Sequence, residues 1–231
     1  MLESIAFIPD GNRRFARNAG INFLSAYQQG TQKAWNVMHW LEEYPKVKSG
    51  TFWMLSLENI QKRRTELSLL FRIFDKELDR VKTSGYFEEK QIRLRFFGRL
   101  DLLPKKLFEK IGKAEEITRE FKTSTINLAL GYSGRAEIVD AAKKLALEVQ
   151  ENKIDLADVD EKSFEKYLYS DLKNPDLVIR TSGEQRTSGF LPFQTGYSEL
   201  YFCKHCWPEF SKNDLAEAIN DFDLRKRNFG K

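Results

Sequence analysis

The sequence has no long hydrophobic run and no segment rich in proline, glycine or serine. No apolar stretch approaches the roughly 18 residues that a membrane-spanning helix requires, and no signal-like segment opens the chain. We therefore expect a cytoplasmic protein, with at most a peripheral attachment to a membrane. Without a linker, an internal repeat or a low-complexity stretch, residues 1–231 are expected to form a single domain.

Cysteine is scarce as well. The two cysteines flank a histidine in the segment Cys203-Lys204-His205-Cys206. One such pair supplies too few ligands for a structural zinc, and His205 is poorly spaced to be a third ligand. A redox-active pair should open a helix, whereas Trp207 and Pro208 follow here. The pattern favours two unlinked thiols at the end of a strand.

Neither sign of charge is in large excess. The chain carries 38 basic and 34 acidic residues, for a formal net charge of +4. This excess is too small to indicate nucleic-acid binding, for which we would expect a basic stripe interleaved with aromatic residues. We expect no nucleic-acid partner, and the placement of the arginines matters more than their number.

Short apolar runs alternate with helical patterns along the chain. The expected strands are residues 4–8, 51–56, 92–97, 125–130, 176–180 and 199–202, and most lack the alternation of a half-exposed strand. The expected helices are residues 31–44, 63–82, 104–121, 135–152, 161–169 and 212–229. This order predicts an α/β fold with a mostly parallel six-stranded sheet flanked by helices. Run 92–97 alternates basic and apolar residues, so it is expected near an edge.

The first expected strand breaks at Pro9 into Asp10-Gly11-Asn12-Arg13-Arg14. A helix should follow from Arg13 to about Ala19, capped by Asp10 or Asn12. Such a corner offers a carboxylate for a cation, and arginines, backbone N–H groups and a helix dipole for a phosphate. The alternative is a capped turn with solvated arginines.

A second loop, residues 176–190, follows another apolar strand. It carries Arg180, Arg186 and several hydroxyl groups, a set that suits a diphosphate. The alternative is a structural loop pinned by ion pairs with Glu184. Because the carboxyl ends of parallel strands meet at one rim, we expect residues 10–12, 56–59, 131–135 and 180–184 to lie together there.

These segments resemble the cis-prenyltransferases, the Z-type isoprenyl diphosphate synthases that include undecaprenyl diphosphate synthase. The similarity covers nearly the whole chain, in the order of the family's motifs. The matching segments are residues 10–16, 56–59, 131–135 and 176–190, then Gln194, Tyr197, residues 199–202, Trp207-Pro208 and residues 227–230.

The resemblance implies an Mg²⁺-dependent condensation of isopentenyl diphosphate with an allylic prenyl diphosphate, which yields a cis-polyprenyl diphosphate. It implies catalytic roles for Asp10 and Asn12, and Mg²⁺ contacts for Asp10 and Glu199. The allylic diphosphate would be bound by Gly11, Arg13, Arg14, Asn59 and Lys62. The isopentenyl diphosphate would be bound by Arg180, Arg186, Ser188 and Gly230.

The resemblance also implies a hydrophobic tunnel between the sheet and the helix expected at 63–82. Apart from this, apolar residues at helical spacing on that helix are simply its core face. The candidate tunnel residues are Phe15, Leu24, Met54, Leu67, Leu70 and Phe74. Family members act as dimers in which the C-terminal tail reaches the neighbouring site, and their product, a glycosyl carrier lipid, partitions into membranes.

Several positions depart from the family pattern. Phe23 stands where family members usually have an arginine for the allylic diphosphate. Tyr27 stands where they often have a histidine, and Lys62 where they usually have an arginine. Asn228 replaces the arginine of the C-terminal Arg-x-Gly motif. Two alternatives therefore stay open: an irregular coupling of allylic diphosphates or transfer to an unusual acceptor, and a catalytic subunit that needs a partner chain.

Overall fold

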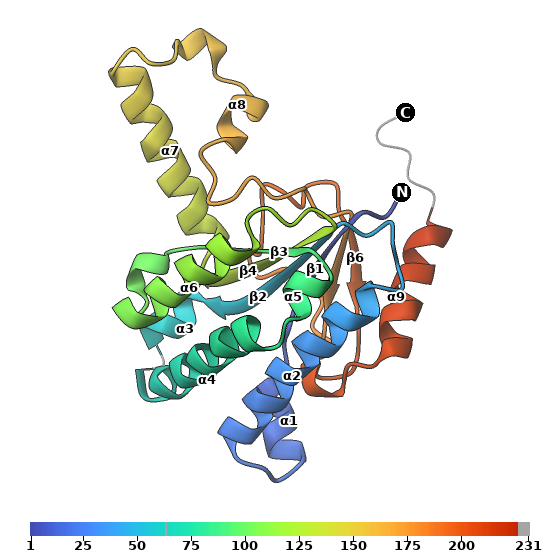
Figure 1. Ribbon diagram of the computed structural model, residues 1–231. Helices are drawn as coiled ribbons and strands as arrows, with labels where there is room; N and C mark the ends of the chain where they lie inside the picture. Colours follow the sequence, from blue (N-terminus) through green and yellow to red (C-terminus); the bar gives the residue numbers. More distant parts are fainter. Residues whose placement is uncertain (63, 226–231) are drawn as a thin grey trace.

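The computed structural model describes residues 1–62 and 64–225, and its centre is a six-stranded sheet (Figure 1). The strand order is β3-β4-β2-β1-β5-β6, and every paired neighbour is parallel. This confirms the expected α/β fold and places the strand of basic and apolar alternation, β3, at an edge. The strands are β1 Ser4–Ile8, β2 Ser49–Ser56, β3 Ile92–Phe97, β4 Ser124–Tyr132, β5 Leu177–Arg180 and β6 Glu199–Phe202.

Helices lie between successive strands from β1 to β5, as connections between parallel strands require, whereas a loop joins β5 to β6. The α-helices are α1 Asn12–Asn18, α2 Phe23–Leu41, α3 Leu57–Lys62, α4 Arg64–Thr83, α5 Tyr86–Glu89, α6 Lys105–Thr118, α7 Gly134–Gln150, α8 Glu161–Glu165 and α9 Lys212–Leu224. Short 3-10 turns occupy η1 Leu100–Leu102, η2 Leu156–Asp158 and η3 Trp207–Glu209. Within the described ranges, no helix combines the length and the hydropathy needed to cross a bilayer.

The two faces of the sheet are covered differently. On one face, strand residues such as Phe7 and Phe52, which stack 4.8 Å apart, pack with α2, α4, α6 and α9 in the main core. On the other face, a smaller cluster joins Ala6 and Val178 to Phe190 and Leu191 from the loop after β5. The inner strands β4, β2, β1 and β5 are therefore covered on both faces, as their apolar runs predict.

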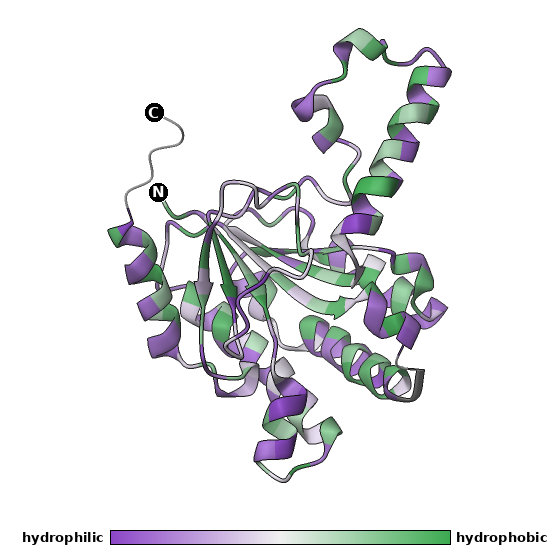
Figure 2. Cartoon of the chain, turned by 180° about the vertical axis from the view of Figure 1, so that it is seen from behind, coloured by the Kyte–Doolittle hydropathy of each residue, from purple (hydrophilic) through white to green (hydrophobic). Residues whose placement is uncertain are grey.

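Helix α7 stands away from this body and forms an arm with α8 (Figure 1). Its base is fixed by buried Glu137, which accepts hydrogen bonds from Tyr132 Oη at 2.6 Å and from Gln194 Nε2 at 3.1 Å. Farther along, hydrophobic segments alternate with hydrophilic ones (Figure 2), and Leu147 is 57% exposed. The arm thus presents apolar surface that the rest of the described chain does not cover.

Several helix limits differ from those expected. Helix α2 starts at Phe23 rather than at residue 31, because Asn22 caps it by accepting from the Ser25 N–H at 2.9 Å. Helices α3 and α5 were not predicted, and the short helix α8 ends at Glu165 instead of residue 169. Helix α9 ends at Leu224, where Arg225 turns to an extended conformation, so the predicted end at residue 229 is wrong.

Candidate active site

The site begins where β1 ends and α1 starts. Gly11 lies there with a φ of 98°, and a Cβ on it would come within 2.8 Å of Ser182 Cβ and 2.9 Å of Cys206 Sγ. Both the backbone conformation and the close approach therefore require glycine. The expected cap is wrong: Gly11 itself is the N-cap residue, and no side chain caps α1. Instead, Asp10 Oδ1 accepts a hydrogen bond from the Gly11 N–H at 2.7 Å.

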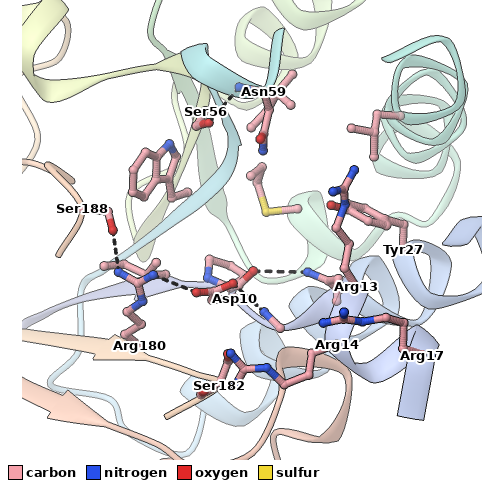
Figure 3. Close-up of a pocket in the computed structure, with 18 residues that line it drawn as sticks. Asp10, Arg13, Arg14, Arg17, Tyr27, Ser56, Asn59, Arg180, Ser182 and Ser188 are labelled. Carbon is pink, nitrogen blue, oxygen red and sulfur yellow. Dashed lines mark hydrogen bonds and ion pairs between the residues drawn. The ribbon is translucent and has the colours of Figure 1, made fainter. Parts of the chain in front are cut away.

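Asp10 meets Arg180 across the neighbouring ends of β1 and β5. Arg180 Nη2 donates to Asp10 Oδ2 at 2.7 Å, and its Nη1 donates to Ser188 Oγ at 2.8 Å (Figure 3). The same Nη1 also donates to the Arg186 carbonyl. The Arg180 side chain is 6% exposed and that of Asp10 is 39% exposed. The guanidinium is thus a fixed positive charge beneath a carboxylate that still faces solvent.

Thr181 ties the same two strand ends together. Its Oγ1 accepts from the Asp10 N–H at 2.9 Å and donates to the Asp10 carbonyl at 2.8 Å. The Trp207 N–H also donates to the Asp10 carbonyl, at 2.8 Å. These bonds hold the Asp10 backbone rigidly, as a preorganised binding site requires.

Glu184 bridges two other predicted arginines. Arg14 Nη2 and Arg186 Nη1 each donate to one of its oxygens at 2.6 Å, and Arg14 Nη1 donates to the Ser182 carbonyl at 2.5 Å. The hydrogen bonds from Arg14 and Arg186 lower the pKa of the Glu184 carboxyl. The Arg186 side chain therefore matches the alternative predicted from the sequence, a structural loop held by ion pairs with Glu184.

A cavity of about 470 Å³ opens above these groups (Figure 3). Its polar lining includes Asp10, Arg13, Arg14, Arg17, Ser56, Asn59, Arg180, Ser182 and Ser188. Four buried atoms of its lining residues have no hydrogen-bond partner among the described residues: Asn12 Oδ1, Trp53 Nε1, Arg180 Nε and Ser182 Oγ. Arginines and unpaired polar atoms around a solvent-reaching space suit an anionic ligand such as a diphosphate.

Two smaller cavities continue from this one between the sheet and helices α2 and α4. The first, of about 40 Å³, shares Met54, Leu70 and Trp53 with the large cavity and adds Phe74. The second, of about 70 Å³, shares Met54 and Phe74 and is almost wholly apolar. They form a narrow apolar series behind the polar mouth, where the resemblance implies a tunnel.

The departures from the family pattern change the wall beside α2. Phe23 packs on Tyr27 with ring centroids 4.2 Å apart, and the Arg13 guanidinium lies 5.3 Å from the Phe23 ring centre. Arg13 also forms an ion pair with Glu66. Arg17, one helical turn beyond Arg13, lines the cavity and adds a cation that sequence reasoning missed. Its spacing on the predicted helix, four residues after Arg13, was the available signal.

Other predicted site residues lie elsewhere. Lys62 is exposed at the end of α3, and neither it nor the Arg186 side chain lines the large cavity. Among the tunnel candidates, the structure brings together Met54, Leu70 and Phe74, whereas Phe15, Leu24 and Leu67 lie outside the lining of the three cavities. Gly230 and Asn228 lie outside the described residues.

Glu199, predicted to contact the same ion as Asp10, lies away from it within the described chain. It pairs with Leu177 at the start of β6, whereas Asp10 follows Ile8, which pairs with Arg180 at the end of β5. Three strand residues, about 10 Å, separate these levels of the sheet. Glu199 is bonded instead to Arg225, whose Nη1 donates to Glu199 Oε2 at 2.7 Å. The two carboxylates expected to share an ion do not meet within the described chain.

Fold and site together define an α/β protein with a polar, arginine-lined pocket backed by apolar cavities. A family model described as "Putative undecaprenyl diphosphate synthase" matches residues 8–230. The chain belongs to this family and is a prenyltransferase.

Known relatives are similar to this chain over nearly its whole length. The tritrans,polycis-undecaprenyl-diphosphate synthase (geranylgeranyl-diphosphate specific) of Methanopyrus kandleri is 40% identical over 230 residues, 99% of this chain and 84% of the relative. The protein of the same name from Pyrobaculum aerophilum is 41% identical over 98% of this chain and 95% of its own. Lavandulyl diphosphate synthase from Lavandula x intermedia, solved with dimethylallyl diphosphate, matches with a TM-score of 0.93 and 31% identity, over 99% of this chain and 98% of that one.

Proposed function

We propose that this prenyltransferase condenses isopentenyl diphosphate with an allylic prenyl diphosphate to form a cis-polyprenyl diphosphate. The observation that carries the proposal is the 2.7 Å contact between Asp10 and Arg180 at a 470 Å³ cavity that continues into apolar space. Such a site can hold charged diphosphate groups at its mouth and hydrocarbon behind them.

The residues divide into two sets around Asp10. Arg180 and Ser188, already joined at 2.8 Å, face the side proposed for isopentenyl diphosphate. The Gly11 corner with Arg14 and Arg17 faces the side proposed for the allylic diphosphate. In the reaction the allylic C–O bond breaks, the isopentenyl double bond forms the new C–C bond, and one proton leaves. We assign the orientation of that proton transfer to Asn12, because its Oδ1 is buried and has no hydrogen-bond partner among the described residues.

We also propose Mg²⁺ as the cofactor, held by Asp10. A hard cation prefers oxygen ligands and commonly keeps water and substrate oxygens around a single carboxylate. The Asp10 side chain fits this role because it is 39% exposed and its position is fixed by Arg180 and the Gly11 N–H. Bound Mg²⁺ would neutralise charge on the leaving diphosphate.

Geranylgeranyl diphosphate is the proposed primer, because the names of the two archaeal relatives specify it. We further propose a homodimer, with the α7–α8 arm and its exposed Leu147 as the apolar surface available for association. The alternative assembly has a second, different subunit. A long polyprenyl product would partition into membranes, as a glycosyl carrier lipid does, and would draw the protein to the membrane surface.

The test is incorporation of labelled isopentenyl diphosphate into lipid with geranylgeranyl diphosphate and Mg²⁺. Asp10→Asn should reduce the rate by at least about 100-fold, comparable to removing one preorganised charge-stabilising group. Glu199→Gln, which removes a carboxylate far from Asp10, should leave the Mg²⁺ dependence unchanged. No incorporation by the wild-type protein, or activity that persists in chelator, would contradict the proposal.

A second candidate is the coupling of allylic diphosphates to each other. It is favoured by the 0.93 TM-score to lavandulyl diphosphate synthase solved with dimethylallyl diphosphate, and by Phe23 in place of an arginine at the allylic side. Incubation with dimethylallyl diphosphate alone, followed by mass spectrometry and NMR of the product, separates the two. A regular cis-linked chain formed only with isopentenyl diphosphate would exclude this candidate.

A further inference from the structure

Three side chains with different ligand chemistry meet next to the active-site loop, the loop that follows Arg180. Cys203 follows β6, His205 lies two residues later, and Asp214 lies in the first turn of α9. Their ligand atoms all lie within 4.8 Å of one another, and His205 Nδ1 is 2.9 Å from Asp214 Oδ1. Within residues 1–62 and 64–225, no other group of three or more such side chains converges in this way.

The cap of α9 holds the carboxylate in place. Asp214 Oδ2 accepts from the Ser211 N–H and from Ser211 Oγ, both at 2.7 Å, as part of a capping box. This leaves Oδ1 directed at His205. Cys203 is 4% exposed, whereas the His205 side chain is 60% exposed. The cluster is therefore buried at Cys203 and open to solvent at His205.

We propose that Cys203, His205 and Asp214 bind a borderline transition-metal cation, with Zn²⁺ the best fit, and that water completes the coordination. One thiolate, one imidazole and one carboxylate suit Zn²⁺, whereas Mg²⁺ prefers oxygen ligands alone. In a tetrahedral zinc site with bonds of about 2.0–2.3 Å, ligand atoms lie about 3.3–3.8 Å apart. In the structure the distances between ligand atoms run from the 2.9 Å of His205 Nδ1 to Asp214 Oδ1 up to at most 4.8 Å. Side-chain shifts of about 1 Å would therefore bring the three ligand atoms to the spacing of a zinc site.

The cation would replace a proton rather than fill an empty space. Binding would release the Cys203 thiol proton to solvent, because a metal binds the thiolate, and His205 would offer a ring nitrogen to the cation. Glu217 and Lys33 contribute opposite charges near the cluster, so neither sign dominates its surroundings.

The cluster lies on the loop that supports the diphosphate site. The Ser182 N–H donates to the His205 carbonyl at 2.6 Å, and the Gly183 N–H donates to the Cys203 carbonyl at 2.8 Å. Both donors belong to the loop that follows Arg180. A cation bound to the two side chains would therefore stiffen the segment whose backbone positions the active-site loop, which gives the site a structural role.

Cys206 provides a matched control. Its sulfur approaches Gly11, and the charges that act on it come from Glu209, Arg14 and Asp10 rather than from Asp214. The sequence pattern excluded zinc because it offered only the Cys203–Cys206 pair and His205. The structure replaces Cys206 with Asp214, a ligand eleven residues from Cys203 that no local spacing rule reveals.

The experiment is a Co²⁺ titration of the purified full-length protein after metal removal, with Mg²⁺ present in excess. We expect thiolate-to-cobalt absorption in the near ultraviolet, which Zn²⁺ should abolish by competition. Cys203→Ser should remove this absorption, and Cys206→Ser should retain it. His205→Ala, at an exposed position that should not disturb folding, should weaken Co²⁺ binding more than about tenfold, because losing even an outer-shell partner costs a metal site about that much.

Three outcomes would overturn the proposal. They are the absence of thiolate absorption in the wild-type protein, its loss in Cys206→Ser but not in Cys203→Ser, and wild-type affinity in His205→Ala. Circular dichroism and thermal unfolding of the metal-free variants establish that each is folded. None of these readouts uses prenyl transfer, so failure here leaves the proposed activity untouched.

Discussion

Replacing Arg180 with lysine separates substrate binding from structural support. The arginine donates to Asp10 Oδ2 at 2.7 Å, to Ser188 Oγ at 2.8 Å and to the Arg186 carbonyl. Lysine keeps the positive charge but offers one compact ammonium group in place of a planar fork. It can therefore reach Asp10 or Ser188, but it cannot hold both together with a diphosphate.

The size of the effect follows from the bonds lost. A hydrogen bond to a charged group is worth about 1.5–3 kcal/mol, so losing one to the substrate should raise KM for isopentenyl diphosphate about 10- to 150-fold. Because Asp10 is 39% exposed and Ser188 is exposed, water can replace the lost internal bonds. We expect the free energy of unfolding to fall by only about 1–3 kcal/mol, or roughly 2–12 °C in Tm.

Steady-state kinetics with each substrate varied in turn, together with thermal unfolding, measures both effects. Arg99→Lys is the matched control, because Arg99 Nε and Nη2 donate to Asp140 at 3.0 Å each, outside the cavity. That variant should lose stability and keep KM within about twofold of wild type. If Arg180→Lys also keeps its KM for isopentenyl diphosphate while losing stability, Arg180 only supports Asp10, and its proposed role in binding substrate is refuted.

Four further predictions test other parts of the site. Glu184→Gln should free Arg14 and Arg186 from their exposed ion pairs and lower KM for isopentenyl diphosphate about two- to fivefold; a higher KM would mean that Glu184 positions these arginines for substrate. Because Arg14 and Arg186 lower the pKa of Glu184, its ion pairs persist at neutral pH and are lost as the pH falls through that lowered value; an NMR titration midpoint at or above the ordinary glutamate value would contradict this. Arg17→Gln should raise KM for the allylic primer about tenfold, through one lost charged hydrogen bond, with KM for isopentenyl diphosphate unchanged; equal effects on both would place Arg17 outside the allylic subsite. Gly30→Ala adds a Cβ 2.3 Å from Asn12 Oδ1 and 3.2 Å from Trp207 Cδ1, so kcat should fall about tenfold, with about 1–3 kcal/mol of overpacking in the unfolding free energy; a wild-type kcat would show that the orientation of Asn12 is not limiting.

Strand β1 was predictable because its burial is uniform. Ser4–Ile8 is buried at every position, and its unbroken apolar run already indicated a strand covered on both faces. The carboxyl ends of parallel strands share a rim, so the approach of Asp10 to Arg180 also followed from sequence. The order of the strands did not, because local patterns carry no information about which strands pair.

Helix limits were less predictable because capping and tertiary packing decide them. Gly30 lies in the second turn of α2, and a glycine inside a helical pattern argues against a helix. Gly30 is tolerated there because it admits Asn12 and Trp207, whose Nε1 donates to the Gly30 carbonyl at 2.7 Å. A contact with a residue 177 positions away thus determines which residue fits in this helix.

The candidate site shows the same limit at the level of single side chains. The rule for parallel sheets brings strand ends together, but it does not say which way a loop side chain turns. Arg186 reaches Arg180 through its carbonyl while its guanidinium binds Glu184, and Arg17 enters the cavity from a helix rather than from a strand end. Glu199 belongs to the strand next to Arg180 and yet lies at the opposite end of it. The sequence therefore identifies the residues at the rim, whereas long-range hydrogen bonds select those that face the cavity.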